Sequence, residues 1–177
     1  MKPEPEIFFS IEPIEKSDQP RSARERDAVG RLIRRLCGED ARLAHTAAGA
    51  PYLLGSPLNI SISHSRNFAA LAWSHACSFG IDIEEPRPDQ LNRVATRFLS
   101  DDELSYYSSI PDGLLKAWTL KEASFKALQS GPLDLRRYRL PLSDGNNIIS
   151  VHDCQLKIVY SGLTRESLFI SIVRRVF

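Results

Sequence analysis

The sequence has few cysteines, no long apolar run and no signal-peptide pattern, and each of these shortages argues against a class of protein. Its three cysteines, Cys37, Cys77 and Cys154, are widely spaced, so we expect neither a disulfide framework nor a CxxC metal site. The longest apolar run, Phe68 to Trp73, is far shorter than the roughly 18 residues that cross a bilayer. The opening residues lack the apolar core of a signal peptide. We therefore expect a cytoplasmic protein with no membrane partner.

Net charge is also nearly absent. The 23 lysines and arginines against 22 acidic residues leave a net charge of +1, which argues against a dedicated nucleic-acid binder. No glycine-rich phosphate loop of the dinucleotide or P-loop type occurs in the sequence. Any site for an anion must therefore be local. The length of 177 residues and the 42% hydrophobic content predict a folded chain of one domain or two tightly joined halves.

Hydrophobic periodicity predicts an α+β chain in which the strands do not alternate regularly with helices. A capping-box pattern at Ser100 and Glu103 opens one helix, and Gly131 with Pro132 is expected to end the last one. The predicted elements are a strand over 7–11, a helix over 21–37, a meander of strands over 58–63, 68–74 and 77–84, helices over 89–98, from 100 and over 113–128, and strands over 148–151, 156–160 and 168–173.

Two carboxylates are predicted to share one face of a strand. In the segment from Phe79 to Glu84, alternation places Ile81 and Ile83 on one face and Asp82 and Glu84 on the other. Neighbouring anions repel unless a cation lies between them, and Mg²⁺ prefers such oxygen ligands. The alternative is an edge strand whose acids face water.

A second candidate cluster lies on the helix over 113–128. Trp118, Glu122 and Lys126 follow one another at steps of four residues and so share one stripe of the helix. This stripe would bring a third carboxylate and a cation together. The alternative is a surface helix with one weak ion pair and a tryptophan in the core.

The third candidate is a histidine among hydroxyl groups. Ser61, Ser63 and Ser65 alternate with isoleucines and surround His64 at the end of a predicted strand. Such a histidine can donate a hydrogen bond to a phosphate, although a purely structural histidine is the alternative. The arginines of the helix over 21–37 form either a solvated face or a local anion site.

Taken together, these segments resemble the 4′-phosphopantetheinyl transferase family, specifically its surfactin-synthetase type. The resemblance rests on the segments Asn59 to Ser65, Gly80 to Glu84 and Trp118 to Lys126, which occur in the family order, and it covers roughly residues 24 to 128. It implies an α+β fold of two similar α/β halves, related by a pseudo-twofold axis, with the active site in the cleft between them. The halves would be residues 1–78 and 79–177, joined in one compact unit.

The resemblance implies a transferase that moves the phosphopantetheine arm of coenzyme A onto a serine of an acyl or peptidyl carrier protein and releases adenosine 3′,5′-bisphosphate. A monomer is implied as well. Mg²⁺ would be held by the three acids, and Glu122, directly or through a metal-bound water, would accept the serine proton, while Lys126 would stabilise the departing phosphate. The residues implied to hold metal are Asp82, Glu84 and Glu122, and those implied to bind coenzyme A are Arg26, Ser63, His64, Lys121 and Lys126.

The sequence departs from the family pattern in two places. Ala50 stands where family members of this type often carry lysine, and the segment from Gln129 to Leu133 keeps only part of a Gly-x-Gly-Leu turn. Two other functions remain open at this point: a Mg²⁺-dependent phosphodiesterase, and a non-catalytic module of the same fold that binds carrier proteins. The sequence does not choose among fatty acid, polyketide and nonribosomal peptide pathways.

Overall fold

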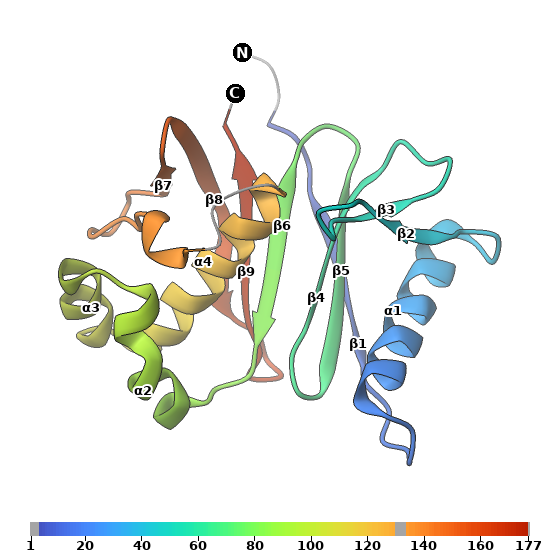
Figure 1. Cartoon of the computed structure of the whole chain (residues 1–177), viewed down its shortest axis with the longest axis horizontal. Coiled ribbons are helices and arrows are strands. Elements are labelled where there is room, and N and C mark those ends of the chain that lie inside the picture. Colours follow the sequence, from blue (N-terminus) through green and yellow to red (C-terminus); the bar gives the residue numbers. More distant parts are fainter. Residues whose placement is uncertain (1–3, 130–133, 177) are drawn as a thin grey trace.

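Two antiparallel sheets pack against each other, with helices on their outer faces (Figure 1). The structure, a computed structural model, describes residues 4–129 and 134–176. Within these residues the elements, in chain order, are β1 Phe8–Pro13, α1 Arg21–Cys37, β2 Leu43–His45, β3 Pro51–Leu53, β4 Asn59–His64, β5 Phe68–Ser74, β6 Phe79–Glu84, α2 Pro88–Phe98, α3 Asp101–Ser108, α4 Gly113–Leu128, the 3-10 turn η1 Leu135–Arg137, β7 Ile148–Val151, β8 Cys154–Leu163 and β9 Phe169–Arg175.

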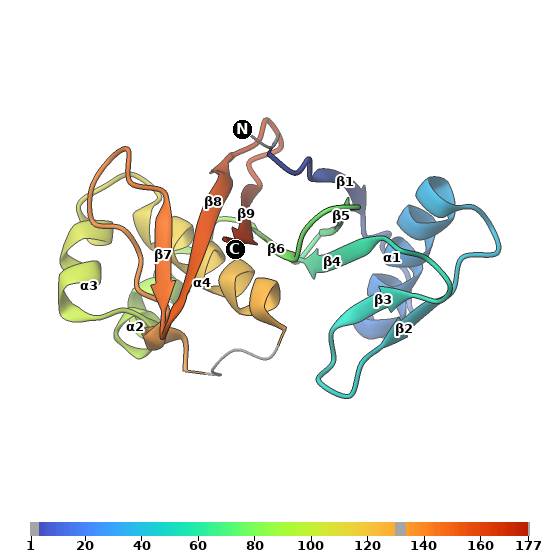
Figure 2. The ribbon, with the colours of Figure 1, turned by 90° about the horizontal axis from the view of Figure 1, so that it is seen from above.

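The layers follow from the alternation of side chains along the strands. The first sheet has the order β1-β5-β4 and the second β6-β9-β8-β7, and β2 pairs with β3 in a separate hairpin. Alternate residues of β5 face α1 on one side and the second sheet on the other. Figure 2 shows α1 and the β2–β3 hairpin on one side of the molecule, and α2, α3 and α4 on the other. None of the described helices is long and apolar enough to span a membrane.

The predicted α+β order is confirmed, and the two longest helices begin and end where the periodicity placed them. Both hydrogen bonds of the capping box form: the Ser100 side chain accepts from the Glu103 amide, and the Glu103 carboxylate accepts from the Ser100 amide. Helix α4 ends at Leu128, and Gln129 follows it with a left-handed backbone. The predicted stop at Gly131 and Pro132 lies outside the described residues.

The predicted three-strand meander is wrong, because β6 does not pair with β5. Instead, β6 pairs with β9 and forms the edge of the second sheet. Where β4 passes β6, two serine hydroxyls take the place of strand carbonyls. Ser61 Oγ accepts from Ile81 N at 3.1 Å, and Ser63 Oγ accepts from Ile83 N at 3.2 Å. The seam between the sheets is therefore made by side chains, which strand periodicity does not reveal.

Helix α4 lies unusually close to β6 because the strand carries a glycine at the contact. A Cβ atom at Gly80 would lie 2.0 Å from the Ala123 carbonyl oxygen and 2.7 Å from the Ala127 nitrogen. No side chain fits in that space. The absence of a side chain at Gly80 thus sets how close the polar residues of α4 come to those of β6.

Candidate active site

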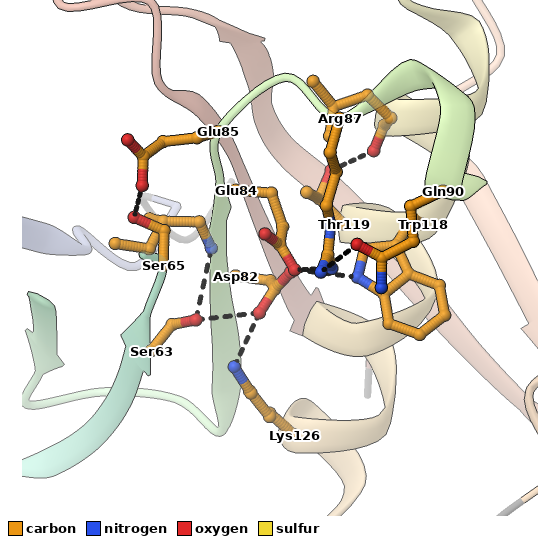
Figure 3. Close-up of polar contacts among 12 residues, drawn as sticks. Ser63, Ser65, Asp82, Glu84, Glu85, Arg87, Gln90, Trp118, Thr119 and Lys126 are labelled. Carbon is orange, nitrogen blue, oxygen red and sulfur yellow. Dashed lines mark hydrogen bonds and ion pairs between the residues drawn. The ribbon is translucent and has the colours of Figure 1, made fainter. Parts of the chain in front are cut away.

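The outer face of β6 and the adjoining stripe of α4 bring Asp82, Glu84 and Lys126 together (Figure 3). As the alternation predicts, Asp82 and Glu84 point away from the isoleucines that pack between the sheets. Lys126 Nζ lies 2.8 Å from Asp82 Oδ1, and Trp118 Nε1 donates to Glu84 Oε1 at 3.2 Å. Strand and helix therefore meet through the residues that the sequence singles out.

Asp82 is buried, and only one of its two carboxylate oxygens accepts hydrogen bonds from the described residues. Its side chain accepts hydrogen bonds on Oδ1 from Ser63 Oγ at 2.8 Å and from Lys126 Nζ, whereas Oδ2 is buried and has no hydrogen-bond partner among the described residues. An unpartnered, buried carboxylate oxygen is costly unless a cation or donor faces it. Oδ2 is therefore a ready ligand for a positive group.

The two glutamates experience the charge of Asp82. Burial first, and then the negative charge of Asp82, raise the pKa of Glu84 to about 7, although Arg87, Trp118 and Lys126 act in the opposite direction. Burial and Asp82 also raise the pKa of Glu122. Lys126, one turn further along the helix, and Arg87 act in the opposite direction on Glu122. Burial and the charge of Asp82 together therefore outweigh the effect of the neighbouring cations on both glutamates.

The donor chemistry fits a hard divalent ion such as Mg²⁺. Within residues 4–129 and 134–176, no three His, Cys, Asp or Glu side chains form a ready-made metal cluster. Lys126 and Arg87 instead pair with Asp82 and Glu84. The orphaned oxygen of Asp82, the mutual repulsion of the acids and the carboxylate ligands all suit a cation at this place. The assignment of Asp82, Glu84 and Glu122 as metal ligands stays a prediction.

Arg26 and His64 line one cavity of about 630 Å³ between α1, the β2–β3 hairpin and the end of β4. His64 Nδ1 lies 3.5 Å from Glu25 Oε1, and both Arg26 and His64 are exposed to solvent. His64 also lines a second cavity of about 420 Å³, which reaches Glu84. The two cavities therefore meet at His64, which joins the basic helix to the acidic cluster.

Ser63 lies beneath the acids of the site and is buried. It is 4% exposed, and its hydroxyl donates to Asp82 while accepting from the Ile83 amide. Both capacities of the hydroxyl are used inside the protein. In this structure Ser63 therefore orients Asp82, and binding of coenzyme A by Ser63 stays a prediction.

Lys121 lies apart from the other predicted site residues and has partners inside the protein. Its side chain is fully buried and points to the side of α4 away from the site, where Nζ lies 2.8 Å from Glu103 Oε2 and donates to the carbonyls of Leu135 and Tyr138. Burial lowers the pKa of this amine, with Glu103 acting against that effect. In this structure the ammonium group ties α3 and η1 to α4, and binding of coenzyme A by Lys121 stays a prediction.

One residue of the site, Arg87, could not be found from the sequence. Arg87, in the loop between β6 and α2, binds Glu84 and covers the Trp118 ring, yet nothing in its spacing marks it. Ala50 lines a cavity of about 230 Å³ that Lys126 also lines, so the missing family lysine leaves this wall without a charge. Arg34 and Arg42 stand in the wall of the neighbouring 630 Å³ cavity.

Comparison with known proteins gives one family. Residues 78–172, more than half of the chain, match the family model of the 4′-phosphopantetheinyl transferase superfamily. The matched region contains β6 and α4, and with them Asp82, Glu84, Glu122 and Lys126. No curated protein matches the sequence.

Proposed function

The chain belongs to the 4′-phosphopantetheinyl transferase superfamily, and on this premise we propose that it transfers the 4′-phosphopantetheine moiety of coenzyme A to a serine of an acyl or peptidyl carrier protein. The proposal includes dependence on Mg²⁺, release of adenosine 3′,5′-bisphosphate and membership of the surfactin-synthetase type. Holo-acyl-carrier-protein synthase activity is the form of the reaction that we propose.

One observation carries the proposal. Asp82 of β6 pairs with Lys126 of α4 and acts electrostatically on Glu84 and Glu122, and His64 at the end of β4 borders a cavity that reaches Glu84. A cluster of acids with a lysine suits a reaction at a charged diphosphate, and an adjoining basic cavity suits the nucleotide that carries it. A phosphodiesterase would also use acids, but no observation on this chain favours it.

The roles of the residues follow from their positions. The serine oxygen forms a bond to the phosphorus next to pantetheine, and the bond from that phosphorus to the bridging oxygen breaks. Glu122, whose raised pKa suits a proton acceptor, takes the serine proton. Lys126 balances the charge on the departing adenosine 3′,5′-bisphosphate. Mg²⁺, held by Asp82, Glu84 and Glu122, would neutralise the diphosphate.

Recognition of the nucleotide is assigned to the cavity beside α1. Arg26 and His64 point cationic or hydrogen-bonding groups at this space, and we propose that they bind the 3′-phosphate. Arg34 and Arg42 line the same cavity and are our candidates to replace the cation that Ala50 lacks.

We further propose the family architecture for the whole chain. Residues 1–78 and 79–177 would be its two similar halves, with the active site in the cleft between them. Support comes from the packing of α1 on the first sheet and of α4 on the second. A monomer in the cytoplasm, with coenzyme A and a carrier protein as partners and no nucleic acid, completes the proposal.

The test is the intact mass of several apo carrier proteins after incubation with this protein, coenzyme A and Mg²⁺. The expected result is a gain of one phosphopantetheine that a chelator abolishes, and the ranking of carriers would identify the pathway. Glu122→Gln should lower the transfer rate by about two orders of magnitude or more, because the serine proton loses its acceptor.

The matched control is Glu166→Gln, which makes the same change at an exposed residue between β8 and β9. It should transfer at the wild-type rate. Transfer at that rate by Glu122→Gln would refute its role as base. Failure of the wild-type protein with every carrier, while coenzyme A still binds, would indicate a non-catalytic binding module.

A further inference from the structure

Glu84 is already paired with a cation in this structure, and that cation is not the lysine of the family motif. The Arg87 guanidinium binds Glu84 Oε1 through Nη2, and the Trp118 indole donates to the same oxygen. Asp82 is paired in the same way with Lys126. Each of these acids therefore carries its own internal counter-ion.

From this pairing we propose that Arg87 is a positioning residue that acts as a removable counter-ion. It holds Glu84 in place in the free protein, competes with a divalent metal for that carboxylate, and turns to the diphosphate of coenzyme A when metal and substrate bind together. The inference rests on the proposed function and adds a residue and a binding order to it.

Arg87 has neighbours on three sides that restrict where its side chain can lie. Pro86 and Pro88 flank it and restrict the backbone where α2 begins. Its guanidinium carbon lies 5.9 Å from the centre of the Trp118 ring, and Nη1 lies 3.4 Å from Gln90 Oε1 (Figure 3). The Trp118 ring is itself held by an edge contact with Phe98 at 5.1 Å. A cation held above an aromatic face keeps its place without a strong hydrogen-bond partner.

The guanidinium also retains donor capacity that the protein does not use. Arg87 Nε is buried and has no hydrogen-bond partner within the described part of the chain. The side chain lines the 420 Å³ cavity that Glu84 and His64 share. An arginine has five N–H donors in a rigid fork suited to phosphate groups. The guanidinium group can therefore move from Glu84 to a diphosphate in the same cavity without passing through the protein interior.

A competing counter-ion makes the binding of metal depend on the binding of substrate. Without coenzyme A, a divalent ion must displace Arg87 from Glu84, or share the carboxylate with a nearby positive charge. When a diphosphate is present, Arg87 gains a new partner and the carboxylate is released. Coupling between two ligands is reciprocal, so metal must strengthen the binding of coenzyme A by the same factor.

The experiment measures Mn²⁺ binding by electron paramagnetic resonance, with and without coenzyme A, for the wild type, Arg87→Gln and Arg87→Lys. Without coenzyme A, Arg87→Gln should bind Mn²⁺ about tenfold more tightly than the wild type, because a competing charge is gone. The factor by which coenzyme A tightens Mn²⁺ binding should be about tenfold smaller in this variant than in the wild type. Arg87→Lys keeps the charge and should fall between the two.

The matched control is Arg97→Gln on α2, which removes an arginine beside the same tryptophan but one that does not contact Glu84. It should bind Mn²⁺ like the wild type. A residue with a purely structural role would weaken Mn²⁺ binding when removed, so weaker or equal binding by Arg87→Gln would overturn the inference. The carrier-protein assay is separate and uses the wild type: tighter Mn²⁺ binding by Arg87→Gln, together with no transfer by the wild-type protein to any carrier, would refute the proposed function and leave the counter-ion role standing.

Discussion

Replacing Gly80 by alanine tests whether the spacing between β6 and α4 creates the site. The new Cβ would lie 2.0 Å from the Ala123 carbonyl oxygen, whereas ordinary contact begins at 3.4 Å. Because the obstructing atoms include the Ala123 oxygen and Ala127 nitrogen of the helix backbone, no side-chain rotation relieves the clash. Helix and strand must separate by more than about 1 Å, which moves Lys126 and Glu122 away from Asp82.

The expected cost appears in both stability and rate. Overpacking of this kind lowers the free energy of unfolding by about 1–3 kcal/mol, and a displacement of about 1 Å in a catalytic group lowers turnover about 100-fold. Urea denaturation measures the first quantity, and carrier-protein mass at saturating coenzyme A measures the second. At Gly162 in β8 an added Cβ would meet only the side chain of the exposed Tyr160, at 3.3 Å, so Gly162→Ala is the matched control. Unfolding and turnover of Gly80→Ala equal to those of this control would refute the reasoning.

Two further predictions concern charges. The pKa of Glu84 is raised from 4.5 to about 7 in the folded protein. Its contribution to the free energy of unfolding is therefore full below pH 4.5 and is lost as the pH rises through 7. With a chelator present to remove metal ions, the loss amounts to roughly 3 kcal/mol. Urea denaturation across this range should show a shallower fall for Glu84→Gln, and identical curves would contradict the assignment. Lys121→Met should lower the free energy of unfolding by about 3–5 kcal/mol because Glu103 is left buried and unpaired, and adding Glu103→Leu should recover part of it. An unchanged stability with a raised KM for coenzyme A would support the phosphate-binding role of Lys121.

Much of the candidate site could be predicted because it depends on local periodicity. Alternation along β6 is enough to put Asp82 and Glu84 on one face, and the four-residue step on α4 is enough to align Trp118 with Lys126. Whether that strand and that helix face each other depends on packing at Gly80. The sequence shows that this residue is a glycine, but it does not show which helix packs against it.

The parts that the sequence did not reveal depend on distant partners. The burial of Lys121 requires Glu103 from another helix, and neighbouring residues on α4 give no sign of it. Arg87 reaches Glu84 through the shape of a loop, which spacing does not encode. The hairpin of β2 and β3 escapes prediction because its strands have only three residues each, too few for a periodic pattern.

The pairing of β6 with β9 has a consequence for the order in which the protein is made. The strand that carries Asp82 and Glu84 finds its only backbone partner among the described strands in residues Phe169–Arg175, which leave the ribosome long after it. Until then, its apolar face, with Ile81 and Ile83, lacks the neighbours that bury it on β9. Such long-range pairing forms late and slowly. Until β9 has been synthesised, the acidic strand therefore presents an open backbone edge and an apolar face to other chains.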